Sequence, residues 1–447
     1  MNKHIVTYTD QISEYAFIAY FFIHSFFPFG AEIIKLLCLL TMIGCWVTRI
    51  KIEKKVLFNR TAIDIPILSY LLCSMIASFH SVYIKSNLET VFHEYFQYFI
   101  IFFCMVNTIH STEQVKRIVK AMLITCALVC AYGLYGYYTG LAINAGRLVA
   151  TFEYHSKMAR YISLLLPITV CLLFWYKNIL IRLSLALLAS MCSFSLILTM
   201  NRTSWMAILV SMFFIGFAFK KKLLMLIFVG VCSICFFFLP SKFFAHAKTI
   251  TQINKYFTTE EILGERVLCW KASISMIRDH PLLGIGPSSR VFRNAYQQYG
   301  QKIRDAEKQT KNEPIPTQPK KKKKKAKEKN KIKMPDRLSN AHNDFLNICV
   351  GTGVMGLLTF LWMFTTLFYA ITKAWRYLNV EYEKALLIGI TASLISILSH
   401  SFTDCVWGKP DTVFLWYIIG ILFVLIRNRP NHDQTSSLQK QSQYNGL

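Results

Sequence analysis

Long apolar runs alternate with short polar connections along almost the whole chain. A transmembrane helix needs about 20 consecutive apolar residues to cross roughly 30 Å of hydrocarbon. About twelve runs approach this length, and they cover residues 12–29, 31–49, 63–80, 91–109, 117–138, 158–176, 179–199, 203–219, 222–240, 345–371, 384–402 and 411–427. This pattern predicts an all-α polytopic membrane protein with about 12 transmembrane helices. No small-residue cleavage site follows the first run, so we expect no removable signal peptide.

Composition agrees with the pattern. Hydrophobic residues make up 54% of the 447 residues, and charged residues only 17%, which excludes an ordinary soluble globular protein. The cysteine total, 13, is odd, and no paired spacing falls in a polar segment, so a disulfide framework is not expected. Cys232 and Cys235 have the CxxC spacing, but they lie inside an apolar run without a nearby histidine. We therefore expect no metal site there.

The positions of Lys and Arg predict the orientation, because short cytoplasmic loops are enriched in both residues. With twelve spans and the N-terminus inside, the inside connections contain the cationic segments 49–60, 116–117, 177–182, 220–222, 373–384 and 427–429. The short outside connections contain only scattered cations. Both termini are thus expected in the cytoplasm.

Residues 241–341 form the one long connection, which this topology places outside between the ninth and tenth spans. It divides the chain into nine spans in 1–240, the loop in 241–341, three spans in 342–428 and a cytoplasmic tail in 429–447. The loop carries about half of the formal charge of +26, and long loops are exempt from the charge rule.

The loop itself has two parts. Thr258 and Glu261 have capping-box spacing, and an apolar stripe of Val267, Trp270, Ile274 and Ile277 follows, so we expect an amphipathic helix over about 259–280 that lies on the bilayer or caps the bundle. Residues 300–337 are polar, proline-containing and Lys-rich. This part is either disordered or an electrostatic tether for membrane lipids with phosphate headgroups. Nucleic-acid binding does not suit a segment between two spans.

Ionisable residues near the hydrocarbon are candidates for function, because each costs roughly 2.5–3.5 kcal/mol on insertion scales. Arg202 lies in a very short turn between two apolar runs. It either snorkels to the interface or binds an anionic group, for which a planar guanidinium is suited. Arg266 in the loop helix and Arg147 in an earlier outer connection are further candidates. His93 and Glu94, inside the fourth span, are interpreted as a buried polar pair that stabilises helix packing.

His342 lies where the loop meets the tenth span. It is either an interfacial residue of a helix start capped by Ser339 or Asn340, or a general base that takes a proton from a hydroxyl. Gly351, Gly353 and Gly356 follow and would let a neighbouring helix pack closely. Asn343 is included among the substrate-binding candidates. Asp336, Asp344, Asp404 and Asp411 are dispersed in the sequence, so no metal site is expected on the outer side.

Three stretches in this order resemble the O-antigen ligase and polymerase family. They are "NRTSWMAIL", which contains Arg202; "ERVLCWKASISMIRDHPLLGIGP", which contains Arg266; and "HNDFLNICVGTGVMG", which starts at His342. The twelve-span layout is similar as well. The stretch near Arg147, "TFEYHSKMA", differs from the family pattern, and so does the Lys-rich run.

The resemblance implies a glycosyltransferase of the bacterial inner membrane that moves a glycan from undecaprenyl diphosphate to a hydroxyl acceptor, without a metal or other cofactor. Arg202 and Arg266 would bind the diphosphate, and His342 would activate the acceptor hydroxyl. Two guanidiniums would stabilise the charge that gathers on the leaving diphosphate, and a single in-line displacement would invert the sugar carbon.

Three functions are considered. The first is an O-antigen ligase whose acceptor is the lipid A core oligosaccharide. The second has the same chemistry with another acceptor, as in a polysaccharide polymerase or a protein O-oligosaccharyltransferase. The third is a transporter of lipid-linked sugars, which should show internal repeats and mid-membrane charges. No repeat is evident here, and the charged candidates lie at the outer rim.

Overall fold

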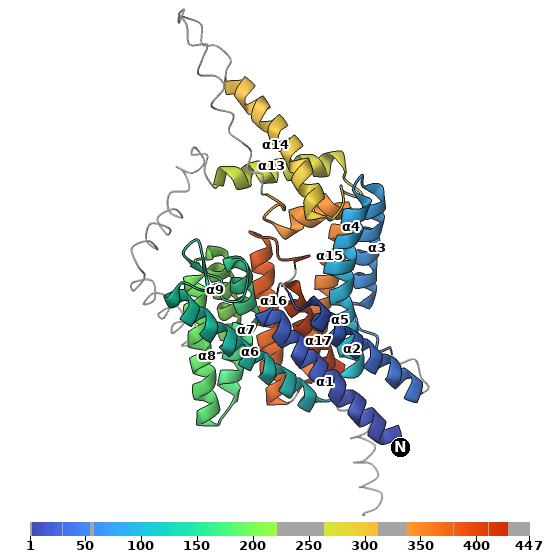
Figure 1. The fold of residues 1–447 in the computed structure, drawn as a ribbon, viewed down its shortest axis with the longest axis vertical. Coiled ribbons are helices and arrows are strands. Elements are labelled where there is room, and N and C mark those ends of the chain that lie inside the picture. Colours follow the sequence, from blue (N-terminus) through green and yellow to red (C-terminus); the bar gives the residue numbers. More distant parts are fainter. Residues whose placement is uncertain are drawn as a thin grey trace, which may run out of the picture.

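A computed structural model gives the fold (Figure 1). It describes residues 2–28, 30–53, 58–220, 263–311, 338–378, 380–409 and 411–427. The helices that correspond to predicted spans are α1 (Asn2–Phe26), α2 (Glu32–Glu53), α3 (Asp64–His80), α5 (Gln97–Thr108), α6 (Thr112–Thr139), α7 (His155–Trp175), α8 (Ile179–Leu198), α9 (Arg202–Ala218), α15 (Asp344–Tyr377), α16 (Glu381–Ser401) and α17 (Thr412–Arg427). The all-α class is confirmed. The ninth predicted span, 222–240, and the CxxC pair lie outside the described residues.

Length and apolar composition support the membrane assignment of these helices. Among the described residues, 6 helices are long and apolar enough to cross a bilayer, namely α2, α6, α7, α8, α15 and α16. Shorter apolar helices are α3, α9 and α17. Many large side chains on their outer surfaces are exposed, as in Leu68, Leu187 and Phe217, which is the expected surface for a chain solvated by lipid.

The fourth predicted span is built from three consecutive pieces. These are α4 (Ile84–Thr90), a π-helix η1 (Val91–Phe96) and α5. His93 lies in the π-helix with its side chain exposed, and Glu94 is half-buried. The interpretation of His93 and Glu94 as a buried polar pair is therefore wrong. The i→i+5 spacing of a π-helix rotates the following residues relative to an α-helix.

The helices form two groups on either side of a central pair (Figure 1). Helices α6, α7, α8 and α9 lie on one side, and α3, α4 and α15 on the other, with α16 and α17 between them. Helix α16 packs against α7 and α9, while α17 packs against α5. A short hairpin of β1 (Ile143–Asn144) and β2 (Arg147–Leu148) connects α6 to α7.

Two helices of the long connection cover one end of the bundle, which we call the loop end (Figure 1). They are α13 (Leu263–Asp279) and α14 (Ser289–Lys311). The buried face of α13 consists of Leu268, Cys269, Ala272 and Met276 and packs against Phe292 and Tyr296 of α14. The predicted apolar stripe does not coincide with this buried face, because Ile274, which belongs to the stripe, is 42% exposed.

Other details of the connection also differ from expectation. Thr258 and Glu261, the expected capping box, lie outside the described residues. The Lys-rich segment was expected to begin near residue 300, but α14 continues to Lys311. The helix continues past residue 300 because its apolar face still packs there. Ile303 is partly buried against the same α13–α14 cluster.

Helix α15 is interrupted near its start. Gly353 has φ +69 and non-helical geometry, and residues 281–286 pack into the break by backbone hydrogen bonds. The N–H groups of Ile285 and Gly286 donate to the carbonyls of Val350 and Gly351, both at 2.9 Å, and that of Val354 donates to Pro281 at 2.8 Å. A Cβ on Gly353 would collide with the carbonyl of Leu282. Gly351, Gly353 and Gly356 were expected to contact a neighbouring helix, but Gly351 and Gly353 contact this loop and Gly356 lies against Thr352 of the same helix.

Candidate active site

His342 lies in a tight turn just before α15 and is half-buried. Its φ of +49 is in the left-handed region, which is uncommon for a residue other than glycine and often marks a functional position. Neighbours hold the turn. The N–H of His342 donates to Asn340 Oδ1 at 3.0 Å, and the N–H of Ala341 donates to Asn347 Oδ1 at 3.1 Å. The imidazole is thus presented at the loop end by a turn that its flanking amides fix.

Asn343 and Asp344 connect this turn to the loop between α16 and α17. Asn343 is the N-cap of α15, because its Oδ1 accepts from Leu346 N at 3.0 Å, and its Nδ2 donates to Phe402 O at 2.9 Å. The expected cap, Ser339 or Asn340, is therefore wrong. Asp344 is 1% exposed and accepts from the backbone N–H groups of Val406 and Trp407. Both side chains hold the α16–α17 loop beside His342.

The carboxylate of Asp404 faces His342 from that loop. Its Oδ1 lies 3.5 Å from His342 Nδ1, and its Oδ2 accepts from Arg160 Nη1 at 3.2 Å. Burial alone would raise the pKa of Asp404, but the contact with His342 and the charge of Arg160 outweigh it and hold that pKa below its ordinary value. Asp404 is therefore a permanent anion next to the imidazole.

Arg160 is the centre of a buried ion cluster. It lies on α7, is 4% exposed, and donates to both carboxylate oxygens of Asp411, at 2.5 and 3.1 Å, besides its bond to Asp404. A bidentate pair of this kind fixes the geometry of both partners. The cluster thereby anchors the start of α17 and the α16–α17 loop to α7, and it fixes the position of Asp404.

Two further residues border this cluster. Arg147 is on β2, and its Nη1 lies 2.9 Å from His155 Nε2. His155 in turn interacts electrostatically with Asp404 and Arg160, which places Arg147 at the margin of the site. His400 is fully buried near Asp404, and its Nε2 lies 2.5 Å from Ser204 Oγ of α9.

Arg202 is the first residue of α9, where Asn201 is the N-cap and accepts from Ser204 N. Together with Met206 and Val210, which follow at successive turns, it lines a groove of about 320 Å³. Ser399, Phe402 and Thr403 form the opposite wall. We call this the α9–α16 groove. Its lining contains one arginine and several apolar side chains, and Thr403 is the neighbour of Asp404 in the chain.

Arg266 lies in the first two turns of α13 and is half-buried. One turn later, the indole N–H of Trp270 donates to the carbonyl of Ala341 at 3.0 Å, and Cys269 Sγ lies 3.5 Å from Asn340 O. Residues four apart lie on the same helix face. Arg266 therefore projects from the face of α13 that contacts the turn of His342.

The predicted residues Arg202, Arg266, His342, Arg147 and Asn343 all lie at the loop end, around the start of α15. The structure connects His342 to Asn343 and to the α16–α17 loop, which also borders the groove of Arg202. Sequence reasoning missed Arg160 and the pairing of Asp404. Arg160 could have been found, because it is an arginine inside an apolar run, and the same criterion selected Arg202.

The aspartates that were judged dispersed include Asp404 and Asp411, which share Arg160. Their oxygens are occupied by protein donors. Among the described residues, a compact set of potential metal ligands lies elsewhere, in the buried thiols of Cys126, Cys130 and Cys192 within the bundle.

Comparison with protein families decides the relationship. The sequence model of the O-Antigen ligase family matches residues 187–361. This segment is similar to the O-antigen ligase family. A search of curated proteins finds no match. The resemblance of the three sequence stretches to that family is confirmed, and the family is one of enzymes with a glycosyltransferase-like ligase or polymerase function.

The matched segment of the O-antigen ligase family contains Arg202, Arg266 and His342. It begins after Arg160 and ends before α16, so Arg160, Asp404 and Asp411 lie outside it. The ion cluster is thus an observation from this structure and does not depend on the match. The family as such implies lipid-linked glycans and lipid acceptors as substrates in general.

Proposed function

We propose that the protein transfers a glycan from undecaprenyl diphosphate to a hydroxyl of the lipid A core oligosaccharide at the periplasmic face of the inner membrane. The observation that carries this proposal is the α9–α16 groove beside His342. A lipid diphosphate has an apolar chain and a dianionic head, and the lining of the groove combines apolar side chains such as Met206 and Val210 with one arginine, Arg202.

The donor would bind with its isoprenoid chain along Met206 and Val210 and its diphosphate at Arg202. The permanent charge and planar fork of arginine suit phosphate oxygens. Arg266 would approach the same head group from α13. Negative charge grows on the diphosphate as the bond to the sugar breaks, so both guanidiniums would bind the transition state more strongly than the ground state.

His342 would act as the general base. Its ring would accept the proton of the acceptor hydroxyl while that oxygen attacks the anomeric carbon, and the diphosphate would leave with the bonding electrons of the C–O bond. The product is inverted at that carbon and no metal takes part in these steps. The anion of Asp404 lies 3.5 Å from the ring and would stabilise the imidazolium that forms.

Purified full-length protein, undecaprenyl diphosphate-linked glycan and lipid A–core glycolipid provide the test. We expect a glycolipid of higher mass and free undecaprenyl diphosphate in equal amounts, and an inverted linkage by NMR. If elongated undecaprenyl-linked glycan forms instead, the enzyme is a polymerase. Transfer to a protein acceptor alone would indicate an oligosaccharyltransferase. Full activity of both His342→Ala and Arg202→Ala would contradict the site.

A further inference from the structure

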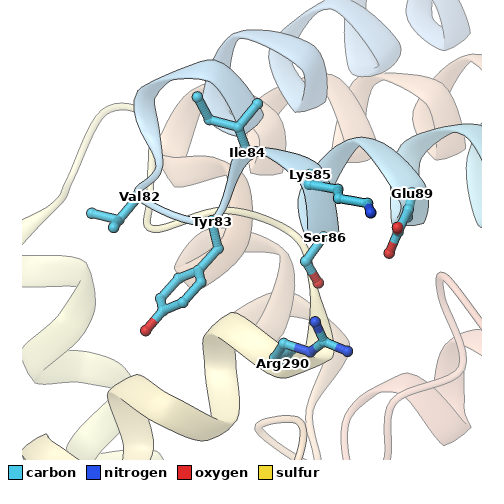
Figure 2. Close-up of a pocket in the computed structure, with 7 residues that line it drawn as sticks. All are labelled: Val82, Tyr83, Ile84, Lys85, Ser86, Glu89 and Arg290. Atoms are coloured by element: carbon cyan, nitrogen blue, oxygen red, sulfur yellow. The ribbon is translucent and has the colours of Figure 1, made fainter.

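A second cavity lies at the loop end on the opposite side of α15 from the groove. It measures about 550 Å³ and is lined by residues 82–86, Glu89 and Arg290. We call it the α4–α14 pocket. Figure 2 shows the guanidinium of Arg290 on the side of the pocket where Ser86, Lys85 and Glu89 lie, while the ring of Tyr83 stands on the other side. The proposed reaction described above assigns no role to any of these side chains.

The pocket has a built frame. Ser86 Oγ lies 2.7 Å from Ser288 Oγ, and Asn87 Oδ1 accepts from Ser288 N at 3.0 Å. Asn87 is fully buried. These bonds join α4 to the turn before α14, and the backbone bonds of residues 285 and 286 to α15 hold that turn in place. The backbone positions of Lys85 and Arg290 are therefore held relative to each other, while both side chains are exposed.

The chemistry of the lining indicates its ligand. Two cations outnumber one carboxylate, so an anionic group is favoured. The carboxylate and the serine and tyrosine hydroxyls can bond sugar hydroxyls, and the ring of Tyr83 offers apolar surface with a polar end. The volume falls within the range of about 300–1,000 Å³ that ligand pockets usually have. A saccharide that carries a phosphate or a carboxylate has this combination.

The position of the pocket indicates which substrate it serves. The α16–α17 loop borders all parts of the site: Phe402 and Thr403 line the donor groove, and Asp404 faces His342. Further along the same loop, Lys409 Nζ lies 3.4 Å from Ser289 Oγ, next to Arg290. In Figure 1, α9 and α4 lie on opposite sides of α16 and α15. The pocket thus lies on the α4 side of α15 and α16, and the donor groove lies on the α9 side.

We propose that the α4–α14 pocket binds the anionic saccharide of the acceptor. This inference rests on the proposed function and adds the site that holds the acceptor. Lys85 and Arg290 would bind its phosphate or carboxylate, so that a hydroxyl further along the saccharide reaches His342. The donor would occupy the other side, and the two substrates would not compete for cations.

Two variants and a matched control test the proposal with full-length protein in detergent. Arg290→Ala and Lys85→Ala each remove one cation of the pocket. Arg293→Ala removes an exposed arginine one turn further along α14 that does not line it. We expect KM for lipid A–core glycolipid to rise about tenfold to hundredfold in the first two variants, because a charged hydrogen bond is lost. KM for the donor, and both constants of Arg293→Ala, should stay at the wild-type value.

Modified acceptors identify the anion. The same glycolipid is used native, dephosphorylated with hydrogen fluoride, or with its carboxyl groups reduced. Wild type should have a higher KM for one of the two modified forms than for native glycolipid. Arg290→Ala should have the same KM for that modified form as for native glycolipid. Arg290→Lys should recover part of the native affinity. Equal KM for all three forms in wild type, or equal behaviour of Arg290→Ala and Arg293→Ala, would overturn the proposal.

Binding without donor separates this inference from the proposed function. Binding of native glycolipid to the protein is measured directly for wild type, Arg290→Ala and Arg293→Ala. Selective loss in Arg290→Ala supports the pocket even if no glycan is transferred, in which case only the proposed reaction fails. Wild-type transfer together with unchanged binding in Arg290→Ala would refute the pocket and leave the reaction intact.

Discussion

The α9–α16 groove and the α4–α14 pocket use cations in different surroundings. In the groove, Arg202 shares the lining with Met206, Val210 and other largely apolar side chains. In the pocket, Lys85 and Arg290 share the lining with two hydroxyls and a carboxylate, besides the apolar Val82 and Ile84. A cation above an apolar track suits a charged head on a lipid chain, whereas cations among polar groups suit a charged sugar. The difference teaches that charge alone does not identify a substrate, since the neighbours decide which molecule the charge can hold.

The base between the two sites should show the largest effect. His342→Ala should lower kcat by about 10²–10⁴-fold, the usual contribution of a general base, with both KM values near those of wild type. Steady-state kinetics with each substrate varied in turn measures this. His80→Ala, an exposed histidine at the end of α3, is the control. A large change in either KM would mean that His342 belongs to one of the two sites rather than between them.

Arg202→Ala should have the second-largest effect. We expect kcat/KM for the donor to fall by about 10²–10³-fold, because a preorganised group that stabilises the leaving diphosphate is lost, while KM for the acceptor is kept. Arg202→Lys should retain part of the activity, since a point charge replaces a planar fork. Arg182→Ala controls for the loss of a surface charge, because Arg182 is an exposed residue near the start of α8. A rise in the acceptor KM would erase the distinction between groove and pocket.

Asp404→Asn should reduce kcat on the order of 10²-fold, the effect expected from a misplaced catalytic group. The amide keeps the shape of the carboxylate but not the charge that faces His342 and Arg160. Single-turnover rates with preformed donor complex measure the step directly. Asp305→Asn on α14, an exposed position, should behave as wild type. If Asp404→Asn is fully active, the contact with the imidazole has no catalytic part.

The lowered pKa of Asp404 also predicts how stability depends on pH. A carboxyl group with a depressed folded-state pKa contributes stability above its unfolded pKa of about 3.9 and loses it as the pH falls toward the folded value. The difference in melting temperature between wild type and Asp404→Asn should shrink as the pH falls below about 4. A difference that stays unchanged when the pH is lowered from about 5 to about 3 would contradict the lowered pKa.

The smallest effect on chemistry, with a clear effect on stability, is expected at the break in α15. Gly353→Ala should destabilise the protein by about 1–3 kcal/mol, because its positive φ and the carbonyl of Leu282 both exclude a Cβ. Thermal unfolding in detergent measures it. Gly44→Ala in α2, where an added Cβ meets nothing within 4 Å, is the matched control. Equal melting temperatures would show that the loop does not depend on this glycine.

The sequence predicted the helices well, because runs near 20 apolar residues have few alternatives in a chain of this composition. It also selected Arg202, Arg266 and His342 from charge position and family resemblance. It could not predict that Asp404 pairs with His342, because the two residues are brought together only by packing of α15 against the α16–α17 loop. The sequence pattern also predicted the wrong buried face for α13. Leu268 and Met276 are buried because α14 packs on them, and the spacing of apolar residues in α13 does not include that contact.

The break in α15 has a consequence for the order of assembly. The carbonyls of Val350 and Gly351 receive their partners from Ile285 and Gly286, so the loop end of this helix is completed by chain that precedes it and lies outside the bundle. The turn of His342 also contacts α13, through the indole N–H of Trp270 and the carbonyl of Ala341. We therefore expect that residues 281–286 and α13 must dock before this end of α15 is complete.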